Sequence, residues 1–433
     1  MSPLVNKRFR AWRTPLLWIA GFALFALFVI WNRDLYTFLT YFTLGLPQGA
    51  IIALIAVGYS MVYGIIQLIN FAHGEIFMFS AYFSLMLVAP TTANHRVGVM
   101  VITASIGIMA ACTAWVAFTN LLHRRSLRLP AALVVGVAVA AINHFLLPGH
   151  GHGGLPFYLA VAVALVYSCC LGVTMDLVAY RPLRNSPRLI PLITAIGISL
   201  FLQSFAQSIW GSSQVDFPYD TKPAALMGHQ VSLGTFHTAA GLQVLRTTRL
   251  DIVIVLVAIV LMVALQLFIR YSRTGKAMRA CAQDAPTAGL MGVQVNNVVA
   301  LAFALGAVLA AMVAPLYVLR GTFIYPIMGY IVGNMAFASA VLGGIGNISG
   351  AMLGGMMIGI IYTFVPLFDT FDSFRMFHWL ELHGWITKQG WNNLVNSVGR
   401  PGQYQLGVAY AFMILIIVFK PTGLLGKASA KRA

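Results

Sequence analysis

Long apolar runs dominate the chain, and they decide what it can fold into. A helix needs about 20 apolar residues to cross the hydrocarbon core of a bilayer. Hydrophobic residues make up 60% of the 433 residues and charged residues only 9%, which excludes a soluble domain. Runs that reach or approach the spanning length lie at 15–31, 36–66, 75–90, 97–122, 131–148, 156–179, 189–210, 251–270, 298–319, 326–343, 347–366 and 405–420.

These runs predict an all-α fold, a polytopic transmembrane helical bundle with about 10–12 spans. The runs 75–90, 131–148, 326–343 and 405–420 are short for a full span, so we expect short or broken helices among them. The basic N-terminal segment and the first run resemble a signal peptide. Because no small-x-small cleavage site follows, we expect an uncleaved first helix.

The net charge of +17 would indicate a nucleic-acid partner in a soluble protein, but the positions of the charges argue otherwise. When the runs alternate across a membrane, most of the 27 lysines and arginines fall in short loops on one side, which marks that side as cytoplasmic. We therefore expect cytoplasmic termini and no nucleic acid. The residues on this side are Lys7, Arg8, Arg10, Arg13, Arg124, Arg125, Arg128, Arg181, Arg184, Arg188, Arg270, Arg273, Lys276, Arg279, Lys420, Lys427, Lys431 and Arg432.

The segment 270–297, RYSRTGKAMRACAQDAPTAGLMGVQVNN, is the sharply patterned polar stretch between two apolar runs. Its basic residues at three-residue spacing would form one stripe on a helix. Asp284 predicts an N-cap, Pro286 a first-turn proline and Gly292 the end of a helix of about two turns. So short a helix is marginal in water and needs a partner surface. We expect another protein to dock here.

No motif supplies an energy source or a reaction centre. The sequence has no GxxxxGKS/T phosphate loop, no GxSxG, no HExxH and no pair of acids on one helix face. His150 and His152 lack a third metal ligand, and the four cysteines lack metal-ligand spacing. We therefore expect no catalysis, no cofactor and no metal.

Polar residues at membrane depth are the next candidates for function. Asn70, His73, Gly74 and Glu75 interrupt an apolar tract in QLINFAHGE. They fit either a structured bend beside a translocation path or a cytoplasmic turn in which Glu75 caps the next helix. Asp176 is expected to be a local ion partner, and the scarcity of intramembrane acids argues against a proton relay.

Glycines are spaced for close helix packing. Gly45 and Gly49 form one GxxxG pair, and further pairs crowd the segment LGGIGNISGAMLGGMMIG that begins at Leu342. Small residues four apart let helix backbones approach closely in lipid. The GGIGN portion also predicts a helix break where backbone lines a path, and its glycines are Gly343, Gly344 and Gly346.

Two loops on the predicted outer side, 211–250 and 366–404, are long. Trp379, Trp385 and Trp391 are spaced six apart in the second loop. This pattern fits an interfacial aromatic belt, and it also fits a surface that meets an external partner.

Five blocks of sequence occur in order along the chain: GLPQGAIIALIAVGYSMVYGIIQLINFAHGE, RPLRNSPRLIPLITAIGISLFLQS, IRYSRTGKAMRACAQDAPTAGLMGVQVNNVVALAFALGA, AVLGGIGNISGAMLGG and KPTGLLG. Together they resemble the branched-chain amino acid permeases of ATP-binding-cassette importers. The INFAHGE form is more similar to the first of the two related permease types. The presence of several blocks at once makes the resemblance specific.

This resemblance implies a non-enzymatic permease subunit in a bacterial inner membrane. The implied partners are a second homologous permease subunit, two cytoplasmic ATPase subunits, a periplasmic substrate-binding protein, membrane lipid and a small amphiphilic substrate such as leucine, isoleucine or valine. ATP binding would move a coupling helix and switch the path from outward-open to inward-open. The residues that match the family's coupling segment are Asp284, Ala285, Pro286, Ala288, Gly289 and Gly292.

The family pattern also divides the chain into regions. We expect an extra N-terminal helix at 1–34, a first permease block at 35–90, inserted helices at 91–155, a permease core at 156–365 that contains the coupling loop 270–297, an external aromatic loop at 366–404, and a last helix with a basic tail at 405–433.

Three other interpretations stay open. Members of the same family are expected to carry urea, amides or aromatic acids, so the blocks do not fix the substrate. An ion- or proton-driven secondary transporter would require intramembrane acids, and the sequence offers only Glu75 and Asp176 near the ends of their runs. A membrane scaffold without transport is the third.

Overall fold

The structure is a computed structural model of the chain, and it describes residues 21–88, 96–121, 128–146, 156–184, 186–187, 189–217, 230–238, 241–321 and 323–426. Within 96–121 and 128–146 it describes the side chains of 103–117 and 129–141. The predicted histidine pair, His150 and His152, lies outside the described residues.

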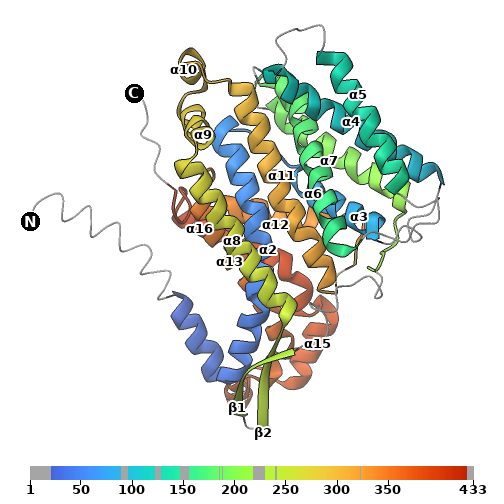
Figure 1. Cartoon of the computed structure of the whole chain (residues 1–433). Coiled ribbons are helices and arrows are strands. Elements are labelled where there is room, and N and C mark those ends of the chain that lie inside the picture. Colours follow the sequence, from blue (N-terminus) through green and yellow to red (C-terminus); the bar gives the residue numbers. More distant parts are fainter. Residues whose placement is uncertain are drawn as a thin grey trace, which may run out of the picture.

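Helices make up most of the described chain (Figure 1). They are the N-terminal helix Gly21–Asn32, α2 (Leu35–Ile66), α3 (His73–Val88), α4 (Arg96–Leu121), α5 (Arg128–Leu146), α6 (Phe157–Met175), α7 (Leu189–Trp210), α8 (Arg249–Tyr271), α9 (Arg273–Gln283), α10 (Ala285–Leu290), α11 (Val295–Leu319), α12 (Met328–Gly343), α13 (Ile348–Phe364), α14 (Arg375–Leu382), α15 (Lys388–Val398) and α16 (Gln405–Phe419).

A helix corresponds to each of the twelve apolar runs. Among the described residues, seven helices are long and apolar enough to cross a membrane, and five shorter apolar helices accompany them. The prediction of an all-α polytopic bundle is confirmed. The expected short helices are also present: α3 and α12 have 16 residues each, about 24 Å at 1.5 Å per residue.

Helix α2 is the centre of the bundle, where it packs against α13, α11, α12 and α8 (Figure 1). Its residues are apolar on all sides, and almost every side chain from Gly45 to Val62 is buried. A helix that is hydrophobic all round can lie in the interior of a bundle, and the small residues of α2 allow its neighbours to surround it closely.

Glycines bring α13 against α2, as their spacing predicted. A side chain at Gly359 would overlap the backbone of Gly49, and one at Gly355 would overlap Ala53. Gly354 in the same way faces the backbone of Ser339 on α12. Contact between backbones gives these helices van der Waals attraction that larger residues would prevent.

Helices α4 and α5, in the region predicted to be inserted, form a pair that packs against the core through α6. Glycine also lets α4 and α5 pack closely, since a side chain at Gly107 would meet Gly136 and Ala140.

The N-terminal helix packs on the segment 366–404 at the end of the bundle opposite α10. Phe374 and Phe377 are fully buried in a cluster with Val29, Phe38 and Phe364. Hydrogen bonds reinforce this contact: the Met376 N–H donates to Asn32 Oδ1 at 2.9 Å. The N-terminal helix and the segment 366–404, two of the three regions in which the chain departs from the family pattern, therefore fold against each other.

The loop 211–250 contains a β-hairpin that the sequence analysis did not anticipate. Strands β1 (Gln230–Thr238) and β2 (Gly241–Thr248) pair antiparallel, with a register irregularity between Ser232 and Gly234. Thr248 then caps α8 by accepting from the Asp251 N–H at 3.1 Å. The hairpin lies at the same end of the molecule as α15 (Figure 1).

We expect Gly359→Ala to destabilise the bundle and Gly407→Ala to leave it intact. The added methyl group at 359 overlaps Gly49, whereas nothing lies within 4 Å of the position a methyl group would take at 407 on α16. Overpacking costs about 1–3 kcal/mol, and a glycine-to-alanine change without strain stabilises by about 0.4–1 kcal/mol. Thermal unfolding of the two variants in detergent checks this, and equal melting temperatures would contradict it.

Candidate functional site

The segment 270–297, for which the resemblance predicts a coupling role and which we therefore call the coupling segment, begins with a sharp break between α8 and α9. Ser272 caps α9, because its hydroxyl accepts from the Gly275 N–H at 2.8 Å. A side chain at Gly275 would overlap the carbonyl oxygens of Phe268 and Ile269. The chain turns here because glycine allows α9 to fold back onto the last turn of α8.

Helix α10 has the caps that the sequence predicted. Asp284 Oδ1 accepts from the Thr287 N–H at 3.1 Å, and Asp284 Oδ2 accepts from the Thr287 hydroxyl at 2.7 Å. Pro286 lies in the first turn, where its missing N–H costs nothing. Gly292 has φ +87°, a left-handed conformation that favours glycine after a helix.

The tip of α10 is an apolar knob at the extreme end of the molecule (Figure 1). Ala288 is buried, while Leu290 is 88% exposed and Met291 81% exposed. Space is open beside Gly289, where an added Cβ would meet only Val295 Cγ2 at 3.9 Å. Exposed apolar side chains on a rigid, capped helix are suited to bury against a partner.

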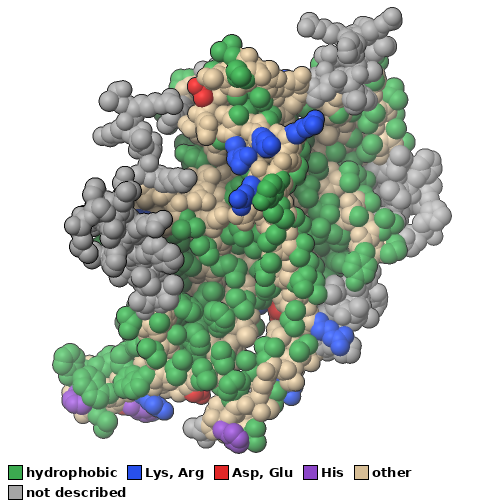
Figure 2. All heavy atoms as spheres, turned by 60° about the vertical axis from the view of Figure 1, so that its left-hand side comes forward, with side chains coloured by type: hydrophobic (Ala, Val, Ile, Leu, Met, Phe, Trp, Pro, Cys, Tyr) green, Lys and Arg blue, Asp and Glu red, His purple; other side chains and the backbone are tan. Residues whose placement is uncertain are grey.

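The basic stripe predicted for this segment is divided between two helices. Arg270 lies in the last turn of α8, whereas Arg273, Lys276 and Arg279 lie on α9. The break at Ser272 still leaves them close, since Arg279 Nη2 donates to the Arg270 carbonyl at 3.2 Å. Lysine and arginine side chains gather just below the tip of the molecule in Figure 2. On the opposite face of α9, burial raises the pKa of the Cys281 thiol, which acts as an apolar packing group.

A second group of polar residues lies inside the bundle, where α2 ends and α3 begins. Gln67 ends α2 in a left-handed conformation with φ 53°, and α3 starts at His73. The polar cluster, as we call it, consists of side chains from four segments that meet around this break: Asn70, His73, Glu75, Tyr180, Ser199 and Gln203.

The break lies at mid-depth in the bundle. Glu75 contacts Ser199, the eleventh of the 22 residues of α7, and His73 contacts Gly306, the twelfth of the 25 residues of α11. The cytoplasmic-turn interpretation, in which Glu75 caps α3, does not describe this geometry, because its side chain bonds to α7.

Four glycines on neighbouring helices, together with Gly74 of α3 itself, leave room for the start of α3 in the core. The His73 ring lies against Gly58 of α2 and Gly306 of α11, and Gly74 lies against the backbone of Gly329 and Gly333 of α12. The first turns of α3 and α12, the two 16-residue helices, therefore touch. Short helices that begin inside the membrane are tolerated where the broken backbone is buried in protein.

Glu75 is fully buried and joins α3 to α7. Its Oε1 accepts from the Ser199 hydroxyl at 2.8 Å and from Gln203 Nε2 at 2.9 Å. Oε2 lies beside Gly329 in the first turn of α12 and has no hydrogen-bond partner among the described residues. Helix N-termini carry partial positive charge, so the starts of α3 and α12 both favour a carboxylate here.

Asn70 is held by a local irregularity of the helix that follows α6. The residues Asp176–Tyr180 form a π-helical turn, which places the Tyr180 hydroxyl 2.8 Å from Asn70 Oδ1 as a donor. Such turns recur at functional sites. Asp176, which was expected to form a local ion pair, pairs with Arg184 at 2.5 Å and not with Arg181, which is closer in sequence. Arg184 also donates to Asn296 Oδ1 at 2.6 Å.

The glycines of GGIGN form the break between α12 and α13. Gly344 and Gly346 have φ +102° and +84°, and Asn347 caps α13. The backbone at the end of α12 bonds to the C-terminal segment: Leu424 N–H donates to the Leu342 carbonyl at 2.8 Å, and Leu425 N–H donates to the Gly343 carbonyl at 3.0 Å. The blocks AVLGGIGN and KPTGLLG therefore fold as one unit.

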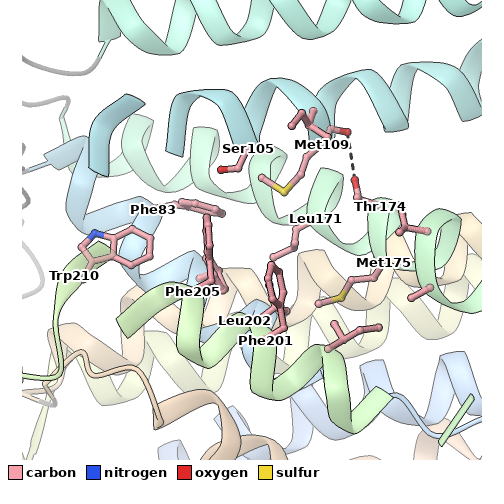
Figure 3. A pocket seen from close by; sticks show the side chains of 15 residues that line it. Phe83, Ser105, Met109, Leu171, Thr174, Met175, Phe201, Leu202, Phe205 and Trp210 are labelled. Carbon is pink, nitrogen blue, oxygen red and sulfur yellow. Dashed lines mark hydrogen bonds between the residues drawn. The ribbon is translucent and has the colours of Figure 1, made fainter. Parts of the chain in front are cut away.

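A cavity of about 330 Å³ lies among α3, α4, α6 and α7 (Figure 3). Aromatic and aliphatic side chains line it, among them Phe83, Met109, Leu171, Phe201 and Phe205, and none of the polar cluster does. The Thr174 hydroxyl in the lining is satisfied by the Cys170 carbonyl at 2.8 Å. With so few polar groups, this cavity is unsuited to the charged ends of an amino acid.

Sequence reasoning missed two residues of the polar cluster and, outside both sites, one ion pair. Ser199 and Gln203 are four residues apart in an apolar run, and that helical spacing was the available signal. Asp251 and Arg320 form an ion pair at 2.8 Å, and Arg320 also bonds to the Leu44 carbonyl at 3.0 Å. No local motif joins residues so distant in sequence. Within the described part of the chain, no group of three or more His, Cys, Asp or Glu residues could hold a metal ion.

We expect Gln203→Leu to loosen α7 from α3. The change removes one of two donors to the buried carboxylate of Glu75, and a lost partner of a buried charged group costs about 1–3 kcal/mol. Gln207→Leu, one turn further along and exposed, is the matched control. Thermal unfolding in detergent is the measurement. Equal stability of the two variants would refute the role of Gln203.

Comparison with known proteins gives the family. The family described as branched-chain amino acid transport system / permease component matches residues 41–417. The high-affinity branched-chain amino acid transport system permease protein LivH of Escherichia coli (strain K12) is 34% identical over 391 residues, which is 90% of this chain and 95% of the relative.

Two further relatives have lower sequence identity. The permease protein BraD of the corresponding high-affinity system in Pseudomonas aeruginosa is 31% identical over 399 residues, 92% of this chain and 99% of the relative. A probable LivH permease protein of Methanocaldococcus jannaschii is 27% identical over 218 residues, 48% of this chain and 62% of the relative. No solved structure matches the chain. The chain belongs to the branched-chain amino acid transport permease family.

Proposed function

We propose that this chain is the first-type permease subunit of an ATP-binding-cassette importer for leucine, isoleucine and valine in a bacterial inner membrane. It pairs with a second homologous permease, takes substrate from a periplasmic binding protein and is driven by two cytoplasmic ATPase subunits. ATP hydrolysis takes place on those subunits. The observation that carries this proposal is the 34% identity to LivH over nine-tenths of the chain.

The coupling segment supports the proposal that separate ATPase subunits drive transport. Its knob, Leu290 and Met291, is connected to the membrane helix α8 through α9 and to the membrane helix α11 through a short turn. Asp284, Ala285, Pro286, Ala288, Gly289 and Gly292 form the capped turn that holds the knob in place. We propose that this turn fits a groove of an ATPase subunit. The basic side chains of α9 would face the same cytoplasmic side, in line with the positive-inside rule.

Helix α11 offers a rigid connection from the knob to the polar cluster. From Val295 to Gly306, beside His73, the distance along the helix is about 16 Å at 1.5 Å per residue. A tilt of α11 driven by the ATPases would therefore act on the start of α3. We propose that the break with Asn70, His73, Gly74 and Glu75 is the flexible point that changes between outward- and inward-open states.

The second break has a different role in this scheme. The Gly343 carbonyl bonds to the C-terminal segment, Gly344 packs against that segment, and Gly346 lies against Gly64 of α2, so this backbone holds α12 and α13 in place. Substrate selection rests mainly on the binding protein, and the path needs few polar groups for an aliphatic zwitterion. Transport moves no net charge across the membrane, because the substrate is a zwitterion and is neutral overall.

Reconstituted uptake tests the function. The full complex in liposomes should import labelled leucine, isoleucine and valine when ATP and the binding protein are supplied, and the isolated chain should import nothing. Preferred uptake of urea, amides or aromatic acids would change the substrate but keep the mechanism. Gradient-driven uptake by the chain alone would replace the proposal with a secondary transporter.

We expect Leu290→Asp with Met291→Asp to uncouple the importer. Two carboxylates in place of exposed apolar side chains cannot bury in an apolar groove without a large desolvation cost. Uptake should fall at least tenfold while the chain still folds, since both side chains point to solvent. Gly289→Trp should act in the same way, because space beside Gly289 is open within this chain.

Gln294→Ala, exposed in the same segment, is the matched control and should keep normal uptake. Each variant is measured for leucine uptake and for co-purification of the ATPase subunits. Full uptake by the Leu290 and Met291 double variant would contradict the docking assignment.

A further inference from the structure

The segment 366–404 is confined to one end of the bundle by its connections. Helix α13 ends at Phe364 and α16 begins at Gln405, and both are membrane helices. A short 3-10 helix, Val365–Ser373, leads into α14, and another, Pro401–Tyr404, leads from α15 into α16. The two amphipathic helices between them therefore lie close to the level where the bundle leaves the membrane.

The orientation of α14 is fixed by contacts on its inner face. Phe374 and Phe377 are buried in the cluster with the N-terminal helix, and the Arg33 guanidinium lies 5.1 Å from the centre of the Phe374 ring. The Gly402 N–H donates to Asp369 Oδ1 at 2.6 Å and ties the end of the segment to its beginning. The segment is a folded element, so its opposite face is a defined surface.

That opposite face is apolar. The outer apolar patch consists of five exposed side chains on α14, α15 and the turn between them: Trp379, Leu382, Trp385, Leu394 and Val398. Leu382 is 84% exposed and Trp385 76% exposed, values unusual for side chains of this size in water.

Figure 2 shows hydrophobic side chains that project sideways at the base of the molecule, with histidine and a basic side chain along their lower edge. The exposed polar residues of α14 and α15 include His378, His383 and Lys388. Exposed apolar and exposed polar side chains thus occur together on these two helices, a combination found on helices that lie in a membrane interface.

The patch is continuous with surface that faces lipid. The N-terminal helix packs directly on this segment, and its own outward side chains, Leu24, Leu27 and Trp31, are 60–67% exposed. Trp31 lies at the end of that helix nearest the segment. Tryptophans at such a level prefer the boundary between headgroups and acyl chains.

We propose that α14 and α15 lie in the headgroup layer of the leaflet opposite the coupling segment, with the outer apolar patch buried among the lipids. This is the outer leaflet in the orientation proposed above. A lipid surface suits the patch better than a protein does, because the patch projects sideways from the bundle and joins the lipid-facing side of the N-terminal helix. The inference rests on the fold and not on the transported substrate.

Site-directed fluorescence in lipid nanodiscs tests the proposal. A cysteine replaces Leu382 in the full chain after its four native cysteines are changed to alanine, and it carries an environment-sensitive dye. The matched control is Asn396→Cys, exposed on the polar side of α15. The dye at 382 should emit at shorter wavelength and be quenched severalfold more by brominated phospholipid than by aqueous iodide, and the dye at 396 should show the reverse.

Equal quenching by iodide at both positions would show that water covers the patch and would overturn the proposal. A change at 382 only after the substrate-binding protein is added would also overturn it, because the patch would then be a protein-docking surface. If the cysteine-free chain does not fold, the same comparison is made with Trp385→Phe, by its loss of lipid-quenched tryptophan emission relative to the unaltered chain.

Discussion

Direct contact between helix backbones is the constraint on which the rest of this structure depends. In lipid, apolar side chains gain little from leaving their surroundings, so helices associate through close packing and buried polar contacts. Gly49 with Gly359 and Gly74 with Gly329 supply that closeness. Close contact in the second pair brings the start of α3, with His73 and Glu75, into the middle of the bundle. Backbone packing therefore also positions the polar cluster.

The sequence was most informative where one local rule decides the structure. Run length predicted the helices, and Asp284, Pro286 and Gly292 predicted α10 with its caps, because a cap is made by residues three or four apart. Reasoning failed where partners are distant. Ser199 and Gln203 acquire their role from Glu75, more than 120 residues away, and Arg320 from Asp251. The β-hairpin was missed because its strands lie in a loop judged only by its length.

The coupling segment and the polar cluster are linked by a single continuous helix. Helix α11 runs from the knob side at Val295 past Gly306, which touches His73. A helix with its hydrogen bonds intact transmits displacement better than a loop, and Arg184 fastens its beginning through Asn296. In the mechanism that we propose, the arrangement separates two tasks: the capped turn recognises a partner, and the glycine-lined contact at mid-depth responds.

The contact between the N-terminal helix and α14 has a consequence for how the chain is made. Asn32 and Met376, which share a hydrogen bond, are 344 residues apart. At roughly 5–20 residues per second, a ribosome needs roughly 20–70 s to make the partner of the first helix. During that interval the side chains of the first helix that contact α14 have only α2, lipid or the insertion machinery to cover them. The native surroundings of this helix are therefore completed in two stages, first by α2 and only much later by the segment 366–404.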